Sequence, residues 1–257
     1  MIRALLWDVD GTLAETERYG HLVAFNRAFA AVGVPWRWSE ARYGELLAIA
    51  GGRERLAHDL GSQAAAPPTA HERGALLEKI HRLKNEHYAA IVARGELPLR
   101  AGVAELLDDC TTARLALGIV TTTTTSNAVA LLTRHLGAQW RSRFKVVVCA
   151  EEAPRKKPDP QAYLLALSAL GIEAHEAVAV EDSPAGVEAA RRAGVPVVVT
   201  HSHYFPSAAG EGVLASGPSL GTSRGWRPPL QAFATRVSLA QIEDWYARRP
   251  PCGIPLT

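Results

Sequence analysis

The sequence predicts an α/β fold: a Rossmann-like parallel sheet core with helices on both faces, plus a small helical domain inserted after the first strand. Short, nearly continuous apolar runs recur along the chain, as expected for strands that are buried on both faces. Helical segments lie between several of these runs, which is the alternation of a parallel sheet. Residues 17–98 break the alternation, because every segment there has a helical pattern.

The expected strands end abruptly at polar residues. The first covers residues 2–7, IRALLW, and is followed by Asp8. Four later runs have the same character, at 115–120, 144–150, 177–183 and 194–200, and helices are expected at 126–136, 159–170 and 184–193. Ligands of such sheets gather beyond the carboxyl ends of the strands. The polar residues that follow the strands are therefore the candidates for a site.

The inserted segment contains several helical stretches that Gly or Pro residues separate. They are HLVAFNRAFAAVG, ARYGELLAIAGG, RERLAHDLG and HERGALLEKIHRLKNEHYAAIVARG, with a loop at 64–70, AAAPPTA. The chain returns to the sheet near residues 97–103. We therefore expect a core of residues 1–16 and 99–257 and a helical domain of residues 17–98.

The pattern fades from about residue 205. The segment 205–230 is rich in Gly, Pro and Ser, and we expect a loop there. Residues 237–249, VSLAQIEDWYARR, predict a terminal helix that Ser238 caps. The last residues, RPPCGIPLT, are expected to fray.

Composition limits the class of protein. The chain has 257 residues, 47% of them hydrophobic, enough for a sizeable core. The net charge is +2 with both signs interspersed, so we expect no nucleic-acid partner. Its three cysteines lie far apart without a CxxC spacing, which argues against a disulfide framework. The first apolar run is too short for a secretory signal, and no segment approaches the ~20 apolar residues of a membrane span. We expect a soluble, cytoplasmic monomer.

Two acidic pairs follow expected strands. Asp8 and Asp10 in WDVDGTLAE are two residues apart, so on a strand they point the same way. Such carboxylates repel each other unless a cation or a shared proton intervenes. Glu181 and Asp182 form the second pair, and oxygen ligands from two strand ends suit Mg²⁺. In isolation, the first pair could be an acidic turn and the second the N-cap of a helix.

A basic residue and a hydroxyl complete the pattern. Lys157 lies in PRKKPDP, where two prolines stiffen a turn that could hold the ammonium group against a phosphate. Taken alone, this stretch is more often a solvated basic loop. Thr121 begins the run TTTTTSN after a strand, but threonine also favours strands for packing reasons.

The order of these motifs is more specific than any of them. DxDGT, a strand that ends in Thr, KP and a strand that ends in EDS occur in the order that resembles the haloacid dehalogenase superfamily, in its phosphatase branch. The resemblance covers about residues 1–205 and implies that residues 17–98 are a small cap domain. It also implies that Thr121 binds phosphate and that Thr122 and Thr123 begin a loop over the site.

A closer similarity is to the CbbY-type sugar phosphatases, which remove xylulose-1,5-bisphosphate, an inhibitor of Rubisco in Calvin-cycle bacteria. It is carried by LAETE, ARYGELLAIAGGRERL, VTTTTTSN, KKPDPQAYLLAL and VEDSPAGVEAARRAG. The chain departs from the family pattern at Trp7, where Phe is usual, by an added residue in ERYGHL, and by a longer segment at 205–230. The added residue leaves the roles of cap residues near His21 open.

The resemblance implies a Mg²⁺-dependent phosphatase that forms an aspartyl phosphate. Asp8 would be the nucleophile and Asp10 the acid–base residue, with a low pKa at Asp8 beside the metal and a raised pKa at Asp10. Thr121 and Lys157 would stabilise the phosphate oxygens. Asp8, Asp10, Asp182 and Glu181 would form the metal site, with the main-chain carbonyl of Asp10 as its ligand and Glu181 behind the other ligands.

The cap would select the substrate. In GGRER, Arg53 and Arg55, with Gly52 beside them, could hold a second phosphate. Glu17 and Tyr43 could bind sugar hydroxyls. GGRER could equally be the start of a helix with a solvated charged face. The cap histidines, His58, His71, His81 and His87, are expected at the surface.

Three other functions remain open at this point. A phosphosugar mutase, like the β-phosphoglucomutases, needs the same core but hands the phosphoryl group to another hydroxyl. A phosphoglycolate phosphatase would leave the cap arginines without a distal phosphate. A non-catalytic phosphosugar-binding regulator would not need all four motifs intact.

Overall fold

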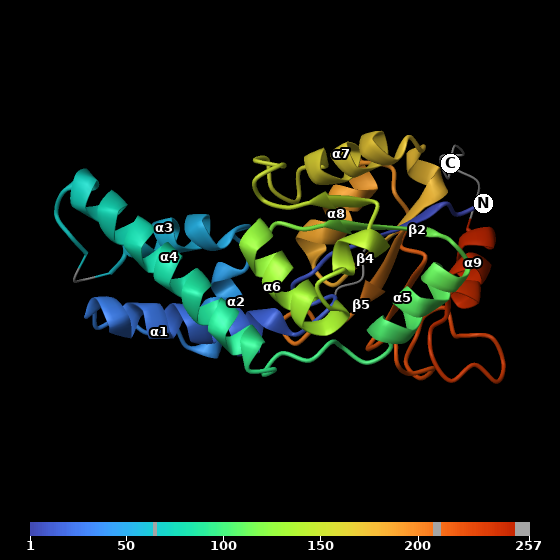
Figure 1. The fold of residues 1–257 in the computed structure, drawn as a ribbon, viewed down its shortest axis with the longest axis horizontal. Coiled ribbons are helices and arrows are strands. Elements are labelled where there is room, and N and C mark those ends of the chain that lie inside the picture. Colours follow the sequence, from blue (N-terminus) through green and yellow to red (C-terminus); the bar gives the residue numbers. More distant parts are fainter. Residues whose placement is uncertain (64–65, 208–211, 250–257) are drawn as a thin grey trace.

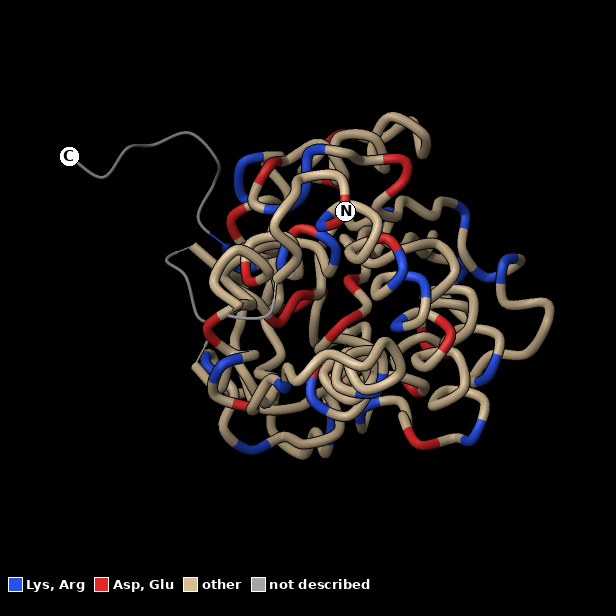
Figure 2. The backbone as a smooth tube through the Cα atoms, turned by 90° about the vertical axis from the view of Figure 1, so that its left-hand side faces the viewer, with Lys and Arg blue, Asp and Glu red and all other residues tan. Residues whose placement is uncertain are grey.

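The computed structural model describes residues 1–63, 66–207 and 212–249. Figure 1 shows two lobes: a sheet covered by helices, and a helical lobe beside it. In Figure 2, which views the molecule from the end of the helical lobe, Lys and Arg residues are interspersed with Asp and Glu over the backbone. Among the helices of these ranges, none combines the length and the apolar character needed to cross a membrane.

The sheet lobe is built on six parallel strands in the order β3-β2-β1-β4-β5-β6. Their bounds are β1 Ala4–Trp7, β2 Ala116–Val120, β3 Val146–Val148, β4 Ala177–Glu181, β5 Val197–Thr200 and β6 Ala215–Gly217. At the centre, β1 pairs with β2 and β4, and Leu6 lies opposite Gly118 and Ala179. The α/β prediction is confirmed, and the five expected apolar runs contain the strands β1 to β5.

Alternate residues of each strand enter different cores. Leu5 and Trp7 of β1 face a core that includes residues of α5 (Val103–Thr112), α6 (Thr125–Leu136) and α9 (Leu239–Ala247). Ala4 and Leu6 face the other core, against α7 (Gln161–Leu170) and α8 (Pro184–Arg192). All four of these strand side chains are fully buried. This explains why the strands are apolar at every position rather than at alternate ones.

The helical lobe begins with a π-helical turn, Glu17–His21, that leads into α1 (Leu22–Val32). It continues through α2 (Glu40–Leu46), α3 (Gly52–Leu60) and the 24-residue α4 (Ala70–Ala93), which packs along α1. Aromatic side chains fill its core, among them Phe25, Phe29 and Trp38. The chain enters and leaves this lobe side by side, because Ala14 forms an antiparallel bridge with Leu99.

Two elements differ from the sequence-based expectation. Strand β6 lies in the segment expected as loop; it has three residues at the edge of the sheet and contains Gly217, so it carries no apolar run. Helix α5 was not expected, although Val103, Leu106, Leu107 and Cys110 form its buried side. The terminal helix is present, and Ser238 caps it by accepting a hydrogen bond from the Gln241 amide. The expected frayed tail lies outside the described residues from 250 onward.

Candidate active site

The carboxyl ends of three neighbouring strands meet at one edge of the sheet. Asp8 follows β1, Thr121 follows β2, and Glu181 ends β4 with Asp182 after it. All four side chains are buried. Because β2, β1 and β4 are adjacent in the sheet, residues separated by more than 100 positions come together here.

Lys157 joins two of these strand ends. Its Nζ donates to Asp8 Oδ1 at 2.7 Å, to Glu181 Oε1 at 2.6 Å and to the Val120 carbonyl at 2.8 Å. Burial by itself would lower the pKa of Lys157, but the facing carboxylates raise it above its ordinary value. The residue is buried, so the alternative of a solvated basic loop does not apply to it.

Asp8, Glu181 and Asp182 form a cluster in which one oxygen of each lies within 4.8 Å of the others. Lys157 contacts only two of these carboxylates, so with all three ionised the cluster would hold more negative than positive charge. Glu181 Oε2 is buried without a hydrogen-bond partner among the described residues. Three buried carboxylates with this excess charge fit a divalent cation, which binds oxygen ligands.

Burial governs how the carboxylates of this cluster titrate without a metal. It raises the pKa of Asp8 to about 7, against the lowering effect of Lys157 and with a further increase from Glu181. Burial also raises the pKa of Asp182 well above its ordinary value, and Asp8 adds to the effect. A bound cation would favour the charged forms and oppose both shifts.

Asp10 belongs to a different network. Its Oδ1 accepts from the Thr16 hydroxyl at 2.6 Å and lies 3.0 Å from His21 Nε2. Burial would raise the pKa of Asp10, but His21, Thr16 and Lys84 together hold it below its usual range. The expected raised pKa at Asp10 is thus wrong for this structure, whereas the low pKa at Asp8 was expected beside a bound metal and stays a prediction. The carboxylate of Asp10 is also not part of the acidic cluster.

The turn after the first strand depends on Gly11. Its φ is +82°, in the left-handed region, and a Cβ atom there would lie 2.1 Å from Asp182 Oδ2. Thr12 donates to Asp182 Oδ1 at 3.5 Å. The turn of DGT therefore brings its main chain directly against the second acidic pair, which a side chain at residue 11 would prevent.

The threonine run has several separate roles. Thr121 Oγ1 accepts from the Thr123 amide at 3.2 Å, which shapes the loop after β2. Thr124 is the N-cap of α6 and accepts from the Asn127 amide at 3.4 Å. The Thr125 amide and hydroxyl bind Glu151. The helix begins at Thr125, one residue earlier than the expected residue 126, because Thr124 already caps it.

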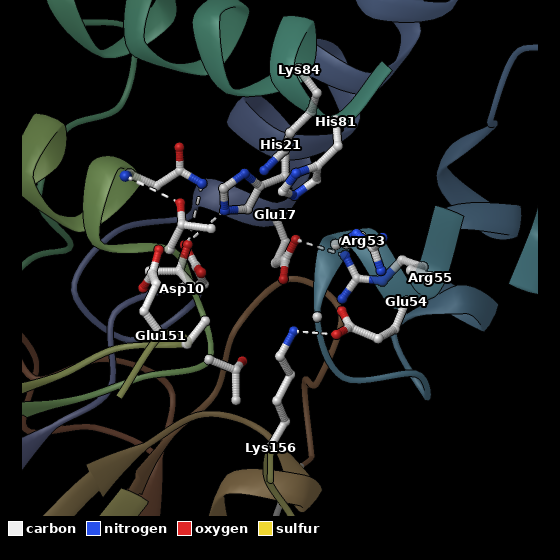
Figure 3. Close-up of a pocket in the computed structure, with 17 residues that line it drawn as sticks. Asp10, Glu17, His21, Arg53, Glu54, Arg55, His81, Lys84, Glu151 and Lys156 are labelled. Atoms are coloured by element: carbon white, nitrogen blue, oxygen red, sulfur yellow. Dashed lines mark hydrogen bonds and ion pairs between the residues drawn. The ribbon is translucent and has the colours of Figure 1, made fainter. Parts of the chain in front are cut away.

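A cavity of about 180 Å³ lies between this loop and the helical lobe. Figure 3 shows that Asp10 lies at one side, His21, His81 and Lys84 above, and the residues of α3 opposite. Among the expected binding residues, its lining includes Glu17, Gly52, Arg53, Arg55, Thr122 and Thr123. The structure thus brings residues of the cap prediction and of the phosphate-loop prediction to one cavity.

The two arginines of GGRER differ. Arg55 is buried: its Nη1 donates to the Tyr43 hydroxyl at 2.8 Å and lies 3.8 Å from Glu17 Oε2, and Tyr43 in turn donates to Glu17. Arg53 is half-exposed and pairs with Glu78, although it reaches the rim of the cavity. Only Arg55 joins the pair of residues expected to bind sugar hydroxyls.

Sequence reasoning missed Lys84. It lies on α4 at the spacing of that helix's buried side, Leu77, Ile80, Lys84, Tyr88 and Ile91. A lysine in an apolar stripe was the available signal. Its Nζ lies 5.3 Å from the centre of the Phe25 ring, it lines the cavity, and burial lowers its pKa to about 8.

Three further cavity residues were not expected. Asn127 donates to Asn85 and Thr123. Lys156 binds Glu54 at 2.7 Å and so joins the sheet lobe to α3. His81 was expected at the surface, but it lines the cavity. Its burial, and to a smaller extent the charge of the nearby Lys84, lowers its pKa to about 4. The expectation was wrong there because α4 turns this face toward the sheet lobe; His58 and His71 are exposed.

A second cavity, of about 430 Å³, reaches the strand ends directly. Asp8, Lys157 and Asp182 line it on the side of the sheet, and Gly44 with neighbouring residues of the helical lobe lines the other side. Asp10, Glu17, Arg55 and Thr122 line both cavities. The two cavities are therefore adjacent, one at the acidic cluster and one at the cap residues.

The arrangement matches a known family. A family model described as haloacid dehalogenase-like hydrolase matches residues 2–194. The chain belongs to the haloacid dehalogenase-like hydrolases. It is 45% identical over 247 residues to protein CbbY (plasmid) of Cupriavidus necator, and the matched region covers 95% of this chain and 97% of the relative. The predicted family and the predicted enzyme class, a phosphatase of this family, are confirmed.

Solved structures of family members agree. CbbY from Rhodobacter sphaeroides in complex with phosphate has a TM-score of 0.76 and 40% identity, covering 83% of this chain and 92% of that one. A mutant of the same protein in complex with xylulose-1,5-bisphosphate has a TM-score of 0.77, also at 40% identity and with the same coverage. The fold class of this haloacid dehalogenase-like hydrolase is thereby confirmed.

Proposed function

We propose that this hydrolase removes a phosphate group from a small sugar bisphosphate, xylulose-1,5-bisphosphate in the first place, by way of an aspartyl phosphate. The observation that carries the proposal is the adjacency of two cavities: a reaction site at Asp8 and Lys157, and a second compartment that the buried Lys84 lines. A substrate with two phosphates would occupy both. The resemblance to CbbY, whose solved complex contains this bisphosphate, supports the choice of sugar.

In the first step, a carboxylate oxygen of Asp8 would attack the phosphorus in line. A P–O bond to Asp8 forms, the P–O bond to the sugar breaks, and the leaving sugar oxygen takes a proton from Asp10. The pKa of Asp10 lies below its usual range in the ligand-free structure, so Asp10 would have to take up this proton when the substrate binds; its Oδ1 lies 3.0 Å from His21 Nε2. Lys157 and the loop at Thr121 would stabilise the charge on the phosphate oxygens.

In the second step, water would attack the aspartyl phosphate while Asp10 accepts its proton. The bond between phosphorus and Asp8 breaks, which releases inorganic phosphate and restores the carboxylate of Asp8. Asp10 therefore serves as the acid in one step and as the base in the other. Its hydrogen bonds to Thr16 and His21 hold it in place for both.

The metal would be Mg²⁺, held by Asp8 and Asp182, together with the main-chain carbonyl of Asp10. When bound, it would neutralise phosphate charge and so allow a carboxylate to act as nucleophile. Glu181 would support the site from behind, because its Oε1 already accepts from Lys157 at 2.6 Å and from Tyr163 at 2.5 Å. The chemistry of the cluster, three carboxylates and no soft ligand, suits this cation.

The cap residues would hold the rest of the substrate. We propose residues 17–98 as the cap and residues 1–16 and 99–257 as the core. Glu17 would bind sugar hydroxyls, and Lys84 with Asn127 would bind the distal phosphate. Tyr43 was expected to bind the sugar as well, but it is fully buried and lines neither cavity, so it would instead hold Glu17 in place together with Arg55. Arg53 would have to leave Glu78 before it could take part. We also propose a role beside the Calvin cycle, a cytoplasmic location and a monomeric state.

The test is phosphate release by the purified protein with Mg²⁺. The substrates would be xylulose-1,5-bisphosphate, ribulose-1,5-bisphosphate, β-glucose-1-phosphate and phosphoglycolate, with Asp8→Asn as the blank. We expect kcat/KM for xylulose-1,5-bisphosphate to be far above the others, and EDTA to abolish turnover.

Two results would change the proposal. Equal, slow rates on all four esters would keep the phosphatase chemistry and reject the sugar bisphosphate. Formation of a sugar phosphate isomer that depends on added bisphosphate would indicate a mutase instead.

A further inference from the structure

A glycine in the middle of a cap helix has no local explanation. Gly44 lies within α2 (Glu40–Leu46), where a glycine costs about 1 kcal/mol relative to alanine. Its φ is not positive, so the main chain does not require it. A Cβ atom at this position would lie 3.1 Å from Cδ1 and 3.3 Å from Cε1 of Tyr204. The missing side chain therefore makes room for an aromatic ring.

That ring comes from the other lobe. Tyr204 follows β5 in the sheet lobe, yet it packs against the aromatic core of the helical lobe. Its ring centre lies 5.8 Å from that of Tyr43, which is fully buried. The Tyr204 hydroxyl is buried and has no hydrogen-bond partner among the described residues. Packing, rather than a hydrogen bond, is thus what Tyr204 contributes.

Tyr43 is the residue on which this contact acts. Its hydroxyl donates to Glu17 and accepts from Arg55 Nη1 at 2.8 Å. Glu17 and Arg55 line both cavities of the site. The position of the Tyr43 ring therefore sets where these two side chains meet a substrate.

The neighbours of Tyr204 continue the contact. Phe205 lines the cavity at Asp8 and Lys157, on which Gly44 also borders. On the solvent side, His203 Nε2 lies 3.6 Å from Glu40 Oε2 of α2, and Arg18 also binds Glu40, at 3.0 Å. The segment 203–205 thus lies between the reaction cavity and the outer edge of α2.

We infer that Tyr204 is a positioning residue for substrate selection: it seats α2 of the cap on the core through the notch at Gly44, and so holds Tyr43, Glu17 and Arg55 in register with Asp8. A residue of the core thus contributes to substrate selection by the cap. This inference rests on the proposed function, because it assigns Tyr43, Glu17 and Arg55 to the sugar portion of a sugar bisphosphate.

The test compares two esters in Tyr204→Ala. We expect the ratio of kcat/KM for xylulose-1,5-bisphosphate to kcat/KM for p-nitrophenyl phosphate to fall about tenfold, the scale of one lost aromatic contact, mainly through KM. Tyr204→Phe should keep the wild-type ratio, because the hydroxyl has no described partner. Phe233→Ala is the matched control: Phe233 is a fully exposed residue of the sheet lobe, so its removal should not change the ratio.

A double-mutant cycle tests the notch itself. Gly44→Ala should lower the ratio several-fold in the wild type and have little effect in Tyr204→Ala, because the ring that its Cβ would meet is gone. The inference would be overturned if the two substitutions had additive effects on the ratio. It would also be overturned if the ratio were unchanged in Tyr204→Ala, which includes an equal fall of kcat/KM for both esters.

A second readout needs no substrate. Hydrogen exchange of the amides of α2 should become faster in Tyr204→Ala, while that of β1 and β2 stays unchanged; unaltered exchange in α2 would reject the docking role. If the wild type cleaves p-nitrophenyl phosphate but not the bisphosphate, the proposed function fails and this exchange measurement decides the inference alone.

Discussion

Replacing Lys157 by methionine removes an ammonium group that lies between two buried carboxylates. Its Nζ lies 2.7 Å from Asp8 Oδ1 and 2.6 Å from Glu181 Oε1. Methionine has a similar length, so little packing is lost and the change is mainly electrostatic. The prediction is a large loss of stability without metal, in addition to the loss of activity.

The magnitude follows from the burial of the pair. Removing one partner of a buried ion pair costs about 3–5 kcal/mol, because the other charge stays buried without compensation. Asp8 can escape part of this cost by taking up a proton, since burial already raises its pKa to about 7 with Lys157 present. We therefore expect a loss of about 3 kcal/mol or more at pH 8 and a smaller loss at pH 5.

The assay is urea unfolding in EDTA at the two pH values, followed by the same titrations with Mg²⁺, which should recover part of the loss. Lys156→Met is the matched control: its bridge to Glu54 is partly exposed and should be worth at most about 1 kcal/mol. If Lys157→Met were no less stable than this control at pH 8, the assignment of Lys157 as counter-charge to the cluster would be refuted.

Three further outcomes are expected. The folded-state pKa of Asp8 is raised from 3.8 to about 7, so its contribution to stability is full below pH 4 and is lost as the pH rises through 7. From pH 5 to pH 8 in EDTA, the free energy of unfolding of the wild type should therefore fall by roughly 3 kcal/mol relative to Asp8→Asn, and an equal trend in both proteins would contradict this. Lys84→Met should raise KM for the bisphosphate at least about tenfold, whereas Lys79→Met, at an exposed position of the same helix, should leave it unchanged. The KM of the wild type should rise above pH 8 as Lys84 loses its proton. Equal KM values for Lys84→Met and Lys79→Met would exclude the phosphate role of Lys84. Gly11→Ala should abolish Mg²⁺-dependent turnover, because its Cβ would lie 2.1 Å from Asp182 Oδ2; calorimetry that still finds wild-type Mg²⁺ binding would argue against that reason.

Part of the site was predictable because strand ends in a parallel sheet share one edge. Asp8, Thr121 and the Glu181–Asp182 pair each follow an apolar run, and the pairing of β1 with β2 and β4 places them together. Lys84 was also accessible, as a lysine in the apolar stripe of α4. The role of His21 was not, because an added residue in ERYGHL left its alignment open and only the fold shows its contact with Asp10.

The α/β core, the inserted helices and the order of the four motifs could be predicted from the sequence, since they depend on local apolar periodicity and on short stretches after strands. The pairing of the charged groups could be learned only from the folded structure. In the structure, Arg55 is buried beside Glu17, Arg53 pairs with Glu78, and Asp10 contacts His21. Tyr204 likewise packs into the notch at Gly44. The physical reason is that burial and pairing arise between segments far apart in the chain, as with Lys157 and Asp8, 149 positions apart, and no local pattern records such contacts.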